Sequence, residues 1–170
     1  MPRIRTARCH EFEKLALVEQ SAASLFRDVG LAWLADGETM DAADLLTMCR
    51  AGTLWIAADD ADEPVGFLAG RQLDSMFYIA EVSVARSSQR QGIGAALVAT
   101  AIEFARTKRF SAVTLTTYRD LSWNAPFYSK LGFVEIDAAE AGSGHVAQLH
   151  AEAKAGHDLE RRCVMMKSLR

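Results

Sequence analysis

The 170-residue sequence is poor in several features whose absence narrows its function. It has only three prolines and three cysteines, and it contains no Cys-x-x-C pair. The odd number and wide spacing of Cys9, Cys49 and Cys163 indicate neither a zinc site nor a disulfide framework. We therefore expect no bound metal, and we expect reduced, mostly buried thiols of the kind found in cytoplasmic proteins.

Long apolar runs and a strong charge of one sign are also missing. No stretch of about 18 consecutive apolar residues occurs, which predicts that no helix spans a membrane. Residues 1–5 lead into no long apolar segment, so we expect no secretory signal peptide. The formal net charge of −3 argues against nucleic acid as the main partner. A cytoplasmic protein without membrane or nucleic-acid partners is the expectation.

The composition that remains is ordinary for a globular protein, with 50% hydrophobic and 24% charged residues. Without repeats or low-complexity tracts, it predicts a single domain over residues 1–170. Strands are predicted by β-branched and alternating stretches at 3–8, 53–58, 65–69, 78–85, 112–117, 133–136 and 161–167. Helices are predicted at 10–27, 41–50, from 92 to about 105, and around Pro126. Residues 138–144 are expected to form a surface loop, followed by weak helical character at 145–155.

The sequence indicates no functional role for the histidines of the C-terminal third. His145, His150 and His157 lack the spacing of metal ligands. We expect all three on the surface.

The most informative stretch runs from residue 81 to residue 97. A strand ends, a polar loop turns, and a helix begins with Gly92 and Gly94 in its first turn. The first N–H groups of a helix lack internal partners, and glycines let an anion approach them closely. Arg90 adds a positive charge, so the stretch predicts a phosphate or diphosphate site. It lacks the Gly-Lys-Ser/Thr of a Walker loop and the third glycine of a dinucleotide fingerprint.

Two strings in this chain resemble the GCN5-related N-acetyltransferase (GNAT) family. Residues 89–95, Q-R-Q-G-I-G-A, resemble its Q/R-x-x-G-x-G/A signature, and residues 127–133, F-Y-S-K-L-G-F, resemble its F/L-Y-x-x-x-G-F helix. The resemblance implies an α/β (α+β) fold with a mixed, mostly antiparallel sheet of about six or seven strands. It further implies helices on both faces of the sheet and a splayed parallel strand pair that holds acetyl-CoA.

The resemblance also implies roles for individual residues. The backbone of Val82, Ser83 and Val84 would pair with the amide-rich pantetheine arm, as an added strand would. The residues expected around the diphosphate are Gln89, Arg90, Gln91, Gly92, Ile93, Gly94 and Ala95. Asn124 and Tyr128 are expected at the cofactor as well, Asn124 either reaching the pantetheine or capping its own helix.

Acetyl transfer to an amine needs a proton acceptor and a proton donor, because an alkyl amine has a pKa of about 10.4. Tyr128 resembles the family tyrosine that protonates the leaving thiolate. Glu81, next to the pantetheine-pairing residues, is the candidate base. Some family members place their carboxylate where this chain has Tyr78, so Glu81, Tyr78 and a chain of water molecules are all open as the base. Backbone N–H groups near Val82 are expected to hold the oxyanion.

The expected function is transfer of acetyl from acetyl-CoA to a primary amine of a small molecule, or of a peptide or protein, through a ternary complex. Phe26, Arg27 and Trp33, on the N-terminal helices, are expected to shape the acceptor site. The alternative is a non-catalytic acyl-CoA-binding sensor or regulatory module on the same fold. A homodimer, which is common in the family, is an open possibility.

Overall fold

The computed structural model describes residues 1–170, which form two compact units. Unit 1 comprises residues 1–70 and 81–101, and unit 2 comprises residues 71–80 and 102–170. The seven strands are β1 (Arg3–Thr6), β2 (Leu54–Ala58), β3 (Pro64–Leu73), β4 (Met76–Val84), β5 (Ala112–Tyr118), β6 (Val134–Ile136) and β7 (Arg162–Ser168). The helices are α1 (Phe12–Ala23), α2 (Ala32–Ala35), α3 (Ala42–Ala51), α4 (Ile93–Thr107), α5 (Ala125–Lys130), α6 (Ala138–Ala141) and α7 (Ser143–Lys154). Short 3₁₀ turns are η1 (Cys9–Glu11), η2 (Ser24–Val29) and η3 (Arg86–Ser88).

The strands follow the hydrogen-bonded order β1-β2-β3-β4-β5-β7-β6. Strands β4 and β5 run parallel, whereas β1 with β2, β2 with β3, β5 with β7 and β6 with β7 are antiparallel. The prediction of a mixed, mostly antiparallel sheet with one parallel pair is confirmed. The connection from β4 through α4 to β5 is the element order that a parallel pair requires.

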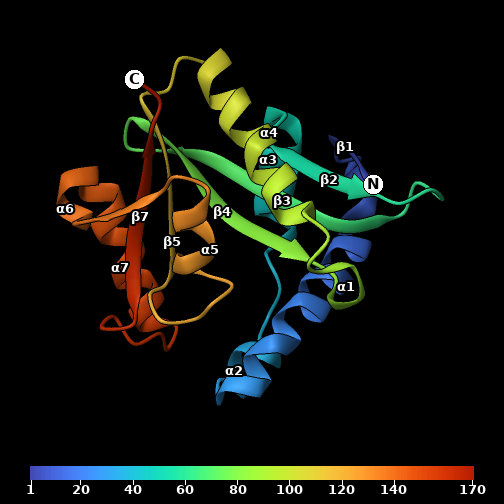
Figure 1. Cartoon of the computed structure of the whole chain (residues 1–170), viewed down its shortest axis with the longest axis horizontal. Helices are drawn as coiled ribbons and strands as arrows, with labels where there is room; N and C mark the ends of the chain where they lie inside the picture. Colours follow the sequence, from blue (N-terminus) through green and yellow to red (C-terminus); the bar gives the residue numbers. More distant parts are fainter. The chain divides into compact units, whose positions relative to one another are not determined.

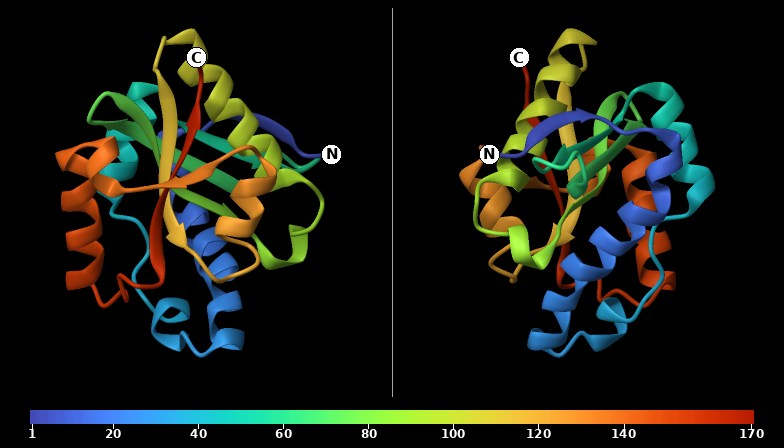
Figure 2. Two further views of the ribbon diagram at one scale, coloured as in Figure 1. Left: turned by 60° about the vertical axis from the view of Figure 1, so that its left-hand side comes forward. Right: turned by 90° about the vertical axis from the view of Figure 1, so that its right-hand side faces the viewer.

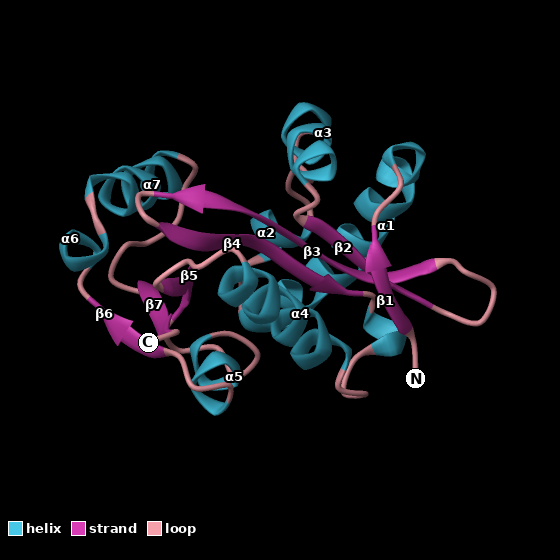
Figure 3. Ribbon diagram, turned by 90° about the horizontal axis from the view of Figure 1, so that it is seen from above, coloured by secondary structure: helices cyan, strands magenta, loops and turns pink.

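Unit 1 is built on strands β1, β2 and β3, which lie side by side in Figure 1. All five residues of β2 are buried, because helices cover both of its faces. Figures 2 and 3 show α1 and α3 on one face of these strands and the first half of α4 on the other. The covering faces are apolar: α1 buries Leu15 and Val18, and α3 buries Leu45 and Met48. On the opposite side Ile93 and Leu97 of α4 approach β3 at Gly66.

Local signals in unit 1 place the ends of α3 where the sequence predicts them, whereas the helix predicted at 10–27 is α1 followed by the 3₁₀ turn η2. The Asp41 carboxylate accepts a hydrogen bond from the N–H of Ala43 at 2.7 Å, which caps α3. The same helix ends at Gly52, whose φ of 73° lies in the left-handed region. Gly30 ends η2 in the same way.

Unit 2 is built on β5 and β7, which pair along their whole length, from Ala112↔Ser168 to Tyr118↔Arg162. Strand β6 pairs antiparallel with β7, and Figure 3 shows these two strands side by side. The core of unit 2 includes the fully buried side chains of Phe77, Leu115 and Phe133.

The expected surface loop at residues 138–144 is wrong, since these residues form α6 and the first turn of α7. Asp137 caps α6 by accepting from the N–H of Ala139. The carboxylate of Asp74 accepts from the N–H groups of Gly144 and His145 at 3.0 and 3.1 Å, which supports the start of α7. The sequence could not show this support, because Asp74 lies 70 positions away from Gly144.

The surface placement of His145 is also wrong, because its side chain is fully buried. Its Nδ1 lies 2.7 Å from the Asp74 carboxylate, and its Nε2 lies 2.7 Å from the Thr114 hydroxyl. Both ring nitrogens therefore have partners, which is what allows burial. His150 is exposed, as expected, and His157 is half-buried.

No helix combines enough length with the apolar character that crossing a bilayer demands.

Candidate active site

The turn between β4 and α4, in unit 1, has a backbone suited to an anion. Arg90 and Gly92 both adopt left-handed conformations, with φ of 61° and 80°. The side-chain amide of Gln89 donates to the carbonyl of Val84 at 2.9 Å and closes the turn. The first helical hydrogen bond of α4 runs from the N–H of Ala96 to the carbonyl of Gly92. The strand, turn and helix that the sequence predicts here are therefore all present in the structure.

The backbone N–H groups of residues 92–95 precede the first hydrogen bond of α4 and therefore have no acceptor within the helix. Residues 90–92 are exposed, and left-handed residues in such a turn make successive N–H groups converge. A Cβ added at Gly92 would have only the Met1 Cε within 4 Å, at 3.7 Å, so the turn is open to solvent. The positive end of the 15-residue helix α4 adds to the field there. The donor set fits a diphosphate group such as that of coenzyme A.

The end of β4 carries the residues expected to bind pantetheine and to act as base. The hydroxyl of Ser83, which is buried, donates to Oε1 of Glu81 at 3.0 Å. The pairing of β4 with β5 ends at Ile79↔Leu115, although β4 continues to Val84. Residues 82–84 are therefore beyond the paired register of the parallel strands.

Arg86 attaches the turn to the N-terminal helices of the same unit. Its N–H donates to the Ser21 hydroxyl at 2.9 Å, and its guanidinium contacts Ser24 and Asp28. The segment formed by α1, η2 and α2 is therefore connected to the residues that follow β4.

The three expected acceptor residues all lie on η2 and α2. Phe26 is half-buried and Arg27 is exposed. Trp33 is 43% exposed, which is unusual for so large an apolar side chain. The charge of Arg27 is offset by an ion pair with Asp36. An exposed aromatic surface beside balanced charges is suited to the alkyl part of an amine substrate.

Sequence reasoning missed one carboxylate in unit 1, that of Glu19 on α1. Burial raises the pKa of the Glu19 carboxyl, and a hydrogen bond from the Met40 N–H, at 3.0 Å, acts in the opposite direction. A carboxyl with a raised pKa is a candidate proton acceptor. The sequence places Glu19 four residues after Leu15 and so on the same side of the helix, but its burial depends on the distant segment at Met40.

In unit 2, α5 carries Asn124 and Tyr128. The ring of Tyr128 is half-buried and lies edge-on to Phe127 and Phe133, with ring centroids 5.0 and 5.8 Å apart. Asn124 stands at the start of α5, but its side chain makes no capping hydrogen bond, so that alternative is wrong. Its Oδ1 instead accepts from the Thr117 hydroxyl at 2.6 Å, which fastens α5 to the end of β5.

Tyr78 is poorly suited to be the base. Its side chain is only 3% exposed, and its hydroxyl lies 2.9 Å from that of Thr116. Burial, and next the charge of Glu152, raise the pKa of Tyr78 to about 12. At neutral pH the hydroxyl therefore keeps its proton.

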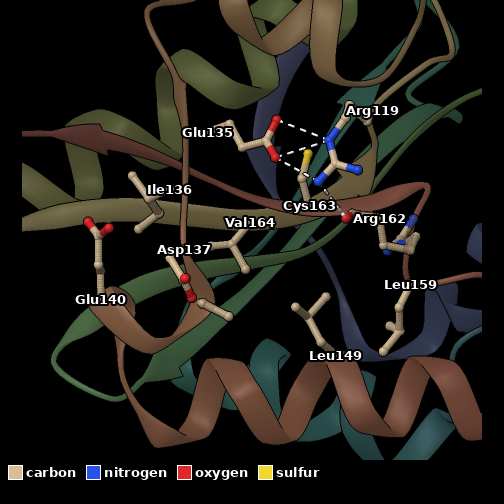
Figure 4. Close-up of a pocket in the computed structure, with 11 residues that line it drawn as sticks. Arg119, Glu135, Ile136, Asp137, Glu140, Leu149, Leu159, Arg162, Cys163 and Val164 are labelled. Carbon is tan, nitrogen blue, oxygen red and sulfur yellow. Dashed lines mark hydrogen bonds and ion pairs between the residues drawn. The ribbon is translucent and has the colours of Figure 1, made fainter.

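A groove in unit 2 contains none of the residues expected in the site. Figure 4 shows the Arg119–Glu135 ion pair, at 2.7 Å, on its rim, with Leu149 and Leu159 on the helix side. Burial raises the pKa of the Cys163 thiol in this groove to about 11, so the thiol is protonated at neutral pH. No group of three or more His, Cys, Asp or Glu side chains in the chain is arranged to hold a metal ion.

Comparison with known proteins places these features in a family. The model of the Acetyltransferase (GNAT) family matches residues 8–133. The peptidyl-lysine N-acetyltransferase YjaB of Salmonella typhimurium (strain LT2) is 32% identical over 136 residues, which are 78% of this chain and 83% of that protein.

Solved structures share the fold at low sequence identity. The PaiA N-acetyltransferase from Thermoplasma acidophilum, in complex with coenzyme A, has a TM-score of 0.73 at 16% identity over 99% of both chains. A GNAT-family acetyltransferase from Staphylococcus aureus Mu50 has a TM-score of 0.75 at 18% identity over 100% of both chains.

Proposed function

The chain belongs to the GNAT acetyltransferase family, and on that premise we propose that it moves the acetyl group of acetyl-CoA to a primary amine by direct attack in a ternary complex. The observation that carries the proposal is the set of backbone N–H groups of residues 92–95, which precede the first hydrogen bond of α4 and have no acceptor within the helix. Acetyl-CoA, the acetyl donor of the family, supplies an activated thioester when it is bound. No covalent enzyme intermediate is needed.

Different residues are proposed to bind different parts of coenzyme A. Residues 89–95 would hold the diphosphate through their N–H groups, with Arg90 as a nearby positive charge. The backbone of residues 82–84, beyond the β4–β5 register, would pair with the pantetheine amides. Asn124 would act by holding the start of α5 in place, since its side-chain oxygen already binds Thr117.

Glu81 is proposed as the proton acceptor for the amine. Deprotonating an alkyl amine at neutral pH costs about 4–5 kcal/mol, and a carboxylate nearby lowers the barrier by accepting the proton. The hydrogen bond from Ser83 orients the Glu81 carboxylate. Backbone N–H groups near Val82 would stabilise the negative charge that develops on the thioester oxygen.

Tyr128 is proposed as the donor of the proton to the departing thiolate. Its ring is held by Phe127 and Phe133, so the hydroxyl has a restricted set of positions. A fixed donor removes the need for a water molecule to deliver the proton.

A lysine side chain of a peptide is the first candidate acceptor, since the YjaB relative is named a peptidyl-lysine N-acetyltransferase. The exposed Trp33 and the neighbouring Phe26 and Arg27 supply an apolar surface for the lysine alkyl chain. A small-molecule primary amine also has to be deprotonated before it attacks the thioester, and it is the second candidate acceptor.

An acceptor screen with the purified full chain tests the proposal. Thiol release from acetyl-CoA is measured with lysine peptides, with the same peptides carrying arginine or acetyl-lysine instead, and with polyamines and other small amines. We expect release only with free primary amines and a mass increase of one acetyl group on the acceptor. Binding of coenzyme A without thiol release for any amine would instead support the acyl-CoA-binding sensor.

A further inference from the structure

Two of the three cysteines meet in unit 1, although 40 positions separate them in the sequence. The Sγ atoms of Cys9, on η1, and Cys49, in the last turn of α3, lie 2.8 Å apart. Both thiols are reduced in the structure. A disulfide bond is about 2.05 Å long, so the two sulfurs need to approach by less than about 1 Å to form one.

The two thiols differ in a way that suits a stepwise oxidation. Cys9 is exposed, so a small oxidant has access to its sulfur. Cys49 is half-buried, and burial, followed by the hydrogen bond with Cys9, raises its pKa to about 11. Its thiol also points toward the carbonyl of Ala7, at 3.5 Å. Cys9 is thus placed to react first, and Cys49 is placed to react with the modified Cys9.

We infer that Cys9 and Cys49 are a redox modification site, which a low-molecular-weight disulfide such as oxidised glutathione converts to an intramolecular disulfide. The Cys9 thiolate attacks one sulfur of the oxidant, forms a mixed disulfide and releases one thiolate. The Cys49 thiol loses its proton to that thiolate, and its sulfur attacks the Cys9 sulfur and releases a second thiolate. This second thiolate takes up from solvent the proton that Cys9 lost before the first step. Two protein thiols are oxidised, and the small disulfide is reduced to two thiols.

The bond would close a loop that contains α1, η2, α2 and most of α3. This loop carries Phe26, Arg27 and Trp33, so under the proposed function oxidation fixes both ends of the segment that contacts the acceptor. We expect the oxidised enzyme to show an altered KM for the amine. The thiol chemistry itself can be measured without any acetyl transfer, so its failure is distinguishable from failure of the proposed function.

The test equilibrates the full chain in glutathione buffers of increasing oxidised fraction, quenches it in acid, denatures it and alkylates the remaining thiols. We expect two thiols to be lost together, a mass decrease of two hydrogens, and a peptide pair joining Cys9 to Cys49. Cys163, which is buried, is the internal control and is expected to stay available for alkylation after denaturation. Stable addition of glutathione to Cys9 with Cys49 still reduced would overturn the inference, as would a disulfide between two chains.

The variants Cys9→Ser and Cys49→Ser provide the matched controls. Each is expected to abolish the loss of two hydrogens and leave at most one glutathione adduct. Closing so long a loop is expected to raise the unfolding temperature of the wild-type chain by about 5 °C or more on oxidation. Cys9→Ser changes an exposed residue, so this variant keeps the test interpretable if Cys49→Ser folds poorly. An oxidation-induced shift of equal size in Cys9→Ser would contradict the inference.

Discussion

The hydroxyl of Tyr128 is a single group whose proposed chemical role can be separated from the packing of its ring. In the variant Tyr128→Phe the contacts with Phe127 and Phe133 are kept. We expect kcat to fall about 100-fold, because a positioned general acid is lost, while the KM for acetyl-CoA changes little. Steady-state kinetics with saturating acceptor measures both constants.

Tyr118→Phe is the control for that measurement. The Tyr118 hydroxyl lies 2.6 Å from Nδ1 of His157, and it has no proposed role in the reaction. We expect an unchanged kcat. Equal kcat values for Tyr128→Phe and the wild type would show that Tyr128 is not the acid.

The base can be identified by comparing Glu81→Gln with Glu19→Gln. A base acts only when it is deprotonated, so kcat/KM rises as the pH increases through its pKa. We expect Glu81→Gln to lower kcat/KM about 100-fold and to remove this rise, and Glu19→Gln to retain it. The pH–rate profiles of both variants provide the measurement.

The opposite result assigns the base differently. Burial raises the pKa of Glu19, so a Glu19 base would place the rise above the ordinary carboxyl pKa of about 4.3. Loss of the rise in Glu19→Gln alone would transfer the role from Glu81 to Glu19.

At the scale of elements, the turn from β4 into α4 depends on Gly92. Its φ of 80° is unfavourable for any side chain, and a Cβ would project into the open space at the N–H groups. We expect Gly92→Ala to lose about 1 kcal/mol of the free energy of unfolding and to weaken coenzyme A binding at least tenfold. Urea unfolding and calorimetric titration measure the two effects.

The variant Gly52→Ala is the control that separates the effect of backbone strain on stability from the effect on coenzyme A binding. Gly52 has a similar φ of 73°, no atom within 4 Å of an added Cβ, and lies at the end of α3. It is expected to show the same loss of stability with normal coenzyme A affinity. A comparable loss of affinity in Gly52→Ala would show that Gly92 acts only through stability.

The start of α7 depends on the charge of Asp74. The hydrogen bond from His145, and then that from the Gly144 N–H, lower the pKa of Asp74 in the folded chain. A lowered pKa stabilises the fold above the unfolded value of about 3.9, and this contribution is lost as the pH falls through the lower folded value. We expect the variant Asp74→Asn to be less stable at neutral pH and to lose less stability between about pH 4 and pH 2 than the wild type.

Urea unfolding at a series of pH values checks the Asp74 prediction. Asparagine suits this position sterically, because Asp74 has a left-handed φ of 52° and asparagine tolerates that region. The substitution therefore removes the charge without adding backbone strain. Parallel stability curves for the variant and the wild type over the acid range would contradict the proposed contribution.

At the scale of the whole molecule, coenzyme A is expected to stabilise the chain against heat. Free ligand at a hundred times its Kd adds about 2.7 kcal/mol to the free energy of unfolding. For a chain of 170 residues this corresponds to a rise of about 5–10 °C in Tm. Thermal unfolding with coenzyme A and with ATP measures it, and an equal shift with ATP would indicate a general nucleotide site.

The family and the order of elements were predictable because their signals are local. A capping carboxylate acts two residues away, as Asp41 does on Ala43, and the stop at Gly52 needs only its own backbone. The diphosphate turn at residues 89–95 likewise uses consecutive N–H groups. Spacing along the chain is enough to show such features.

The C-terminal helices α6 and α7 could not be predicted from local signals. Residues 138–144 have small side chains and glycines, so the sequence predicts a loop, whereas α6 and α7 form there. The helix α7 is supported by Asp74, and His145 is buried because Asp74 and Thr114 satisfy its two nitrogens. Asp74 lies in the turn between β3 and β4, and Thr114 lies on β5, so no periodicity of residues 138–155 indicates them.

By itself, the sequence determined the family, the strand–turn–helix proposed to bind a diphosphate, and the tyrosine proposed as acid. Each of these features depends on residues that are neighbours along the chain. The tertiary structure alone decided that Glu19 has a raised pKa, that His145 is buried and that Cys9 meets Cys49. Burial and proximity depend on which distant segments pack together, and that is a property of the folded chain.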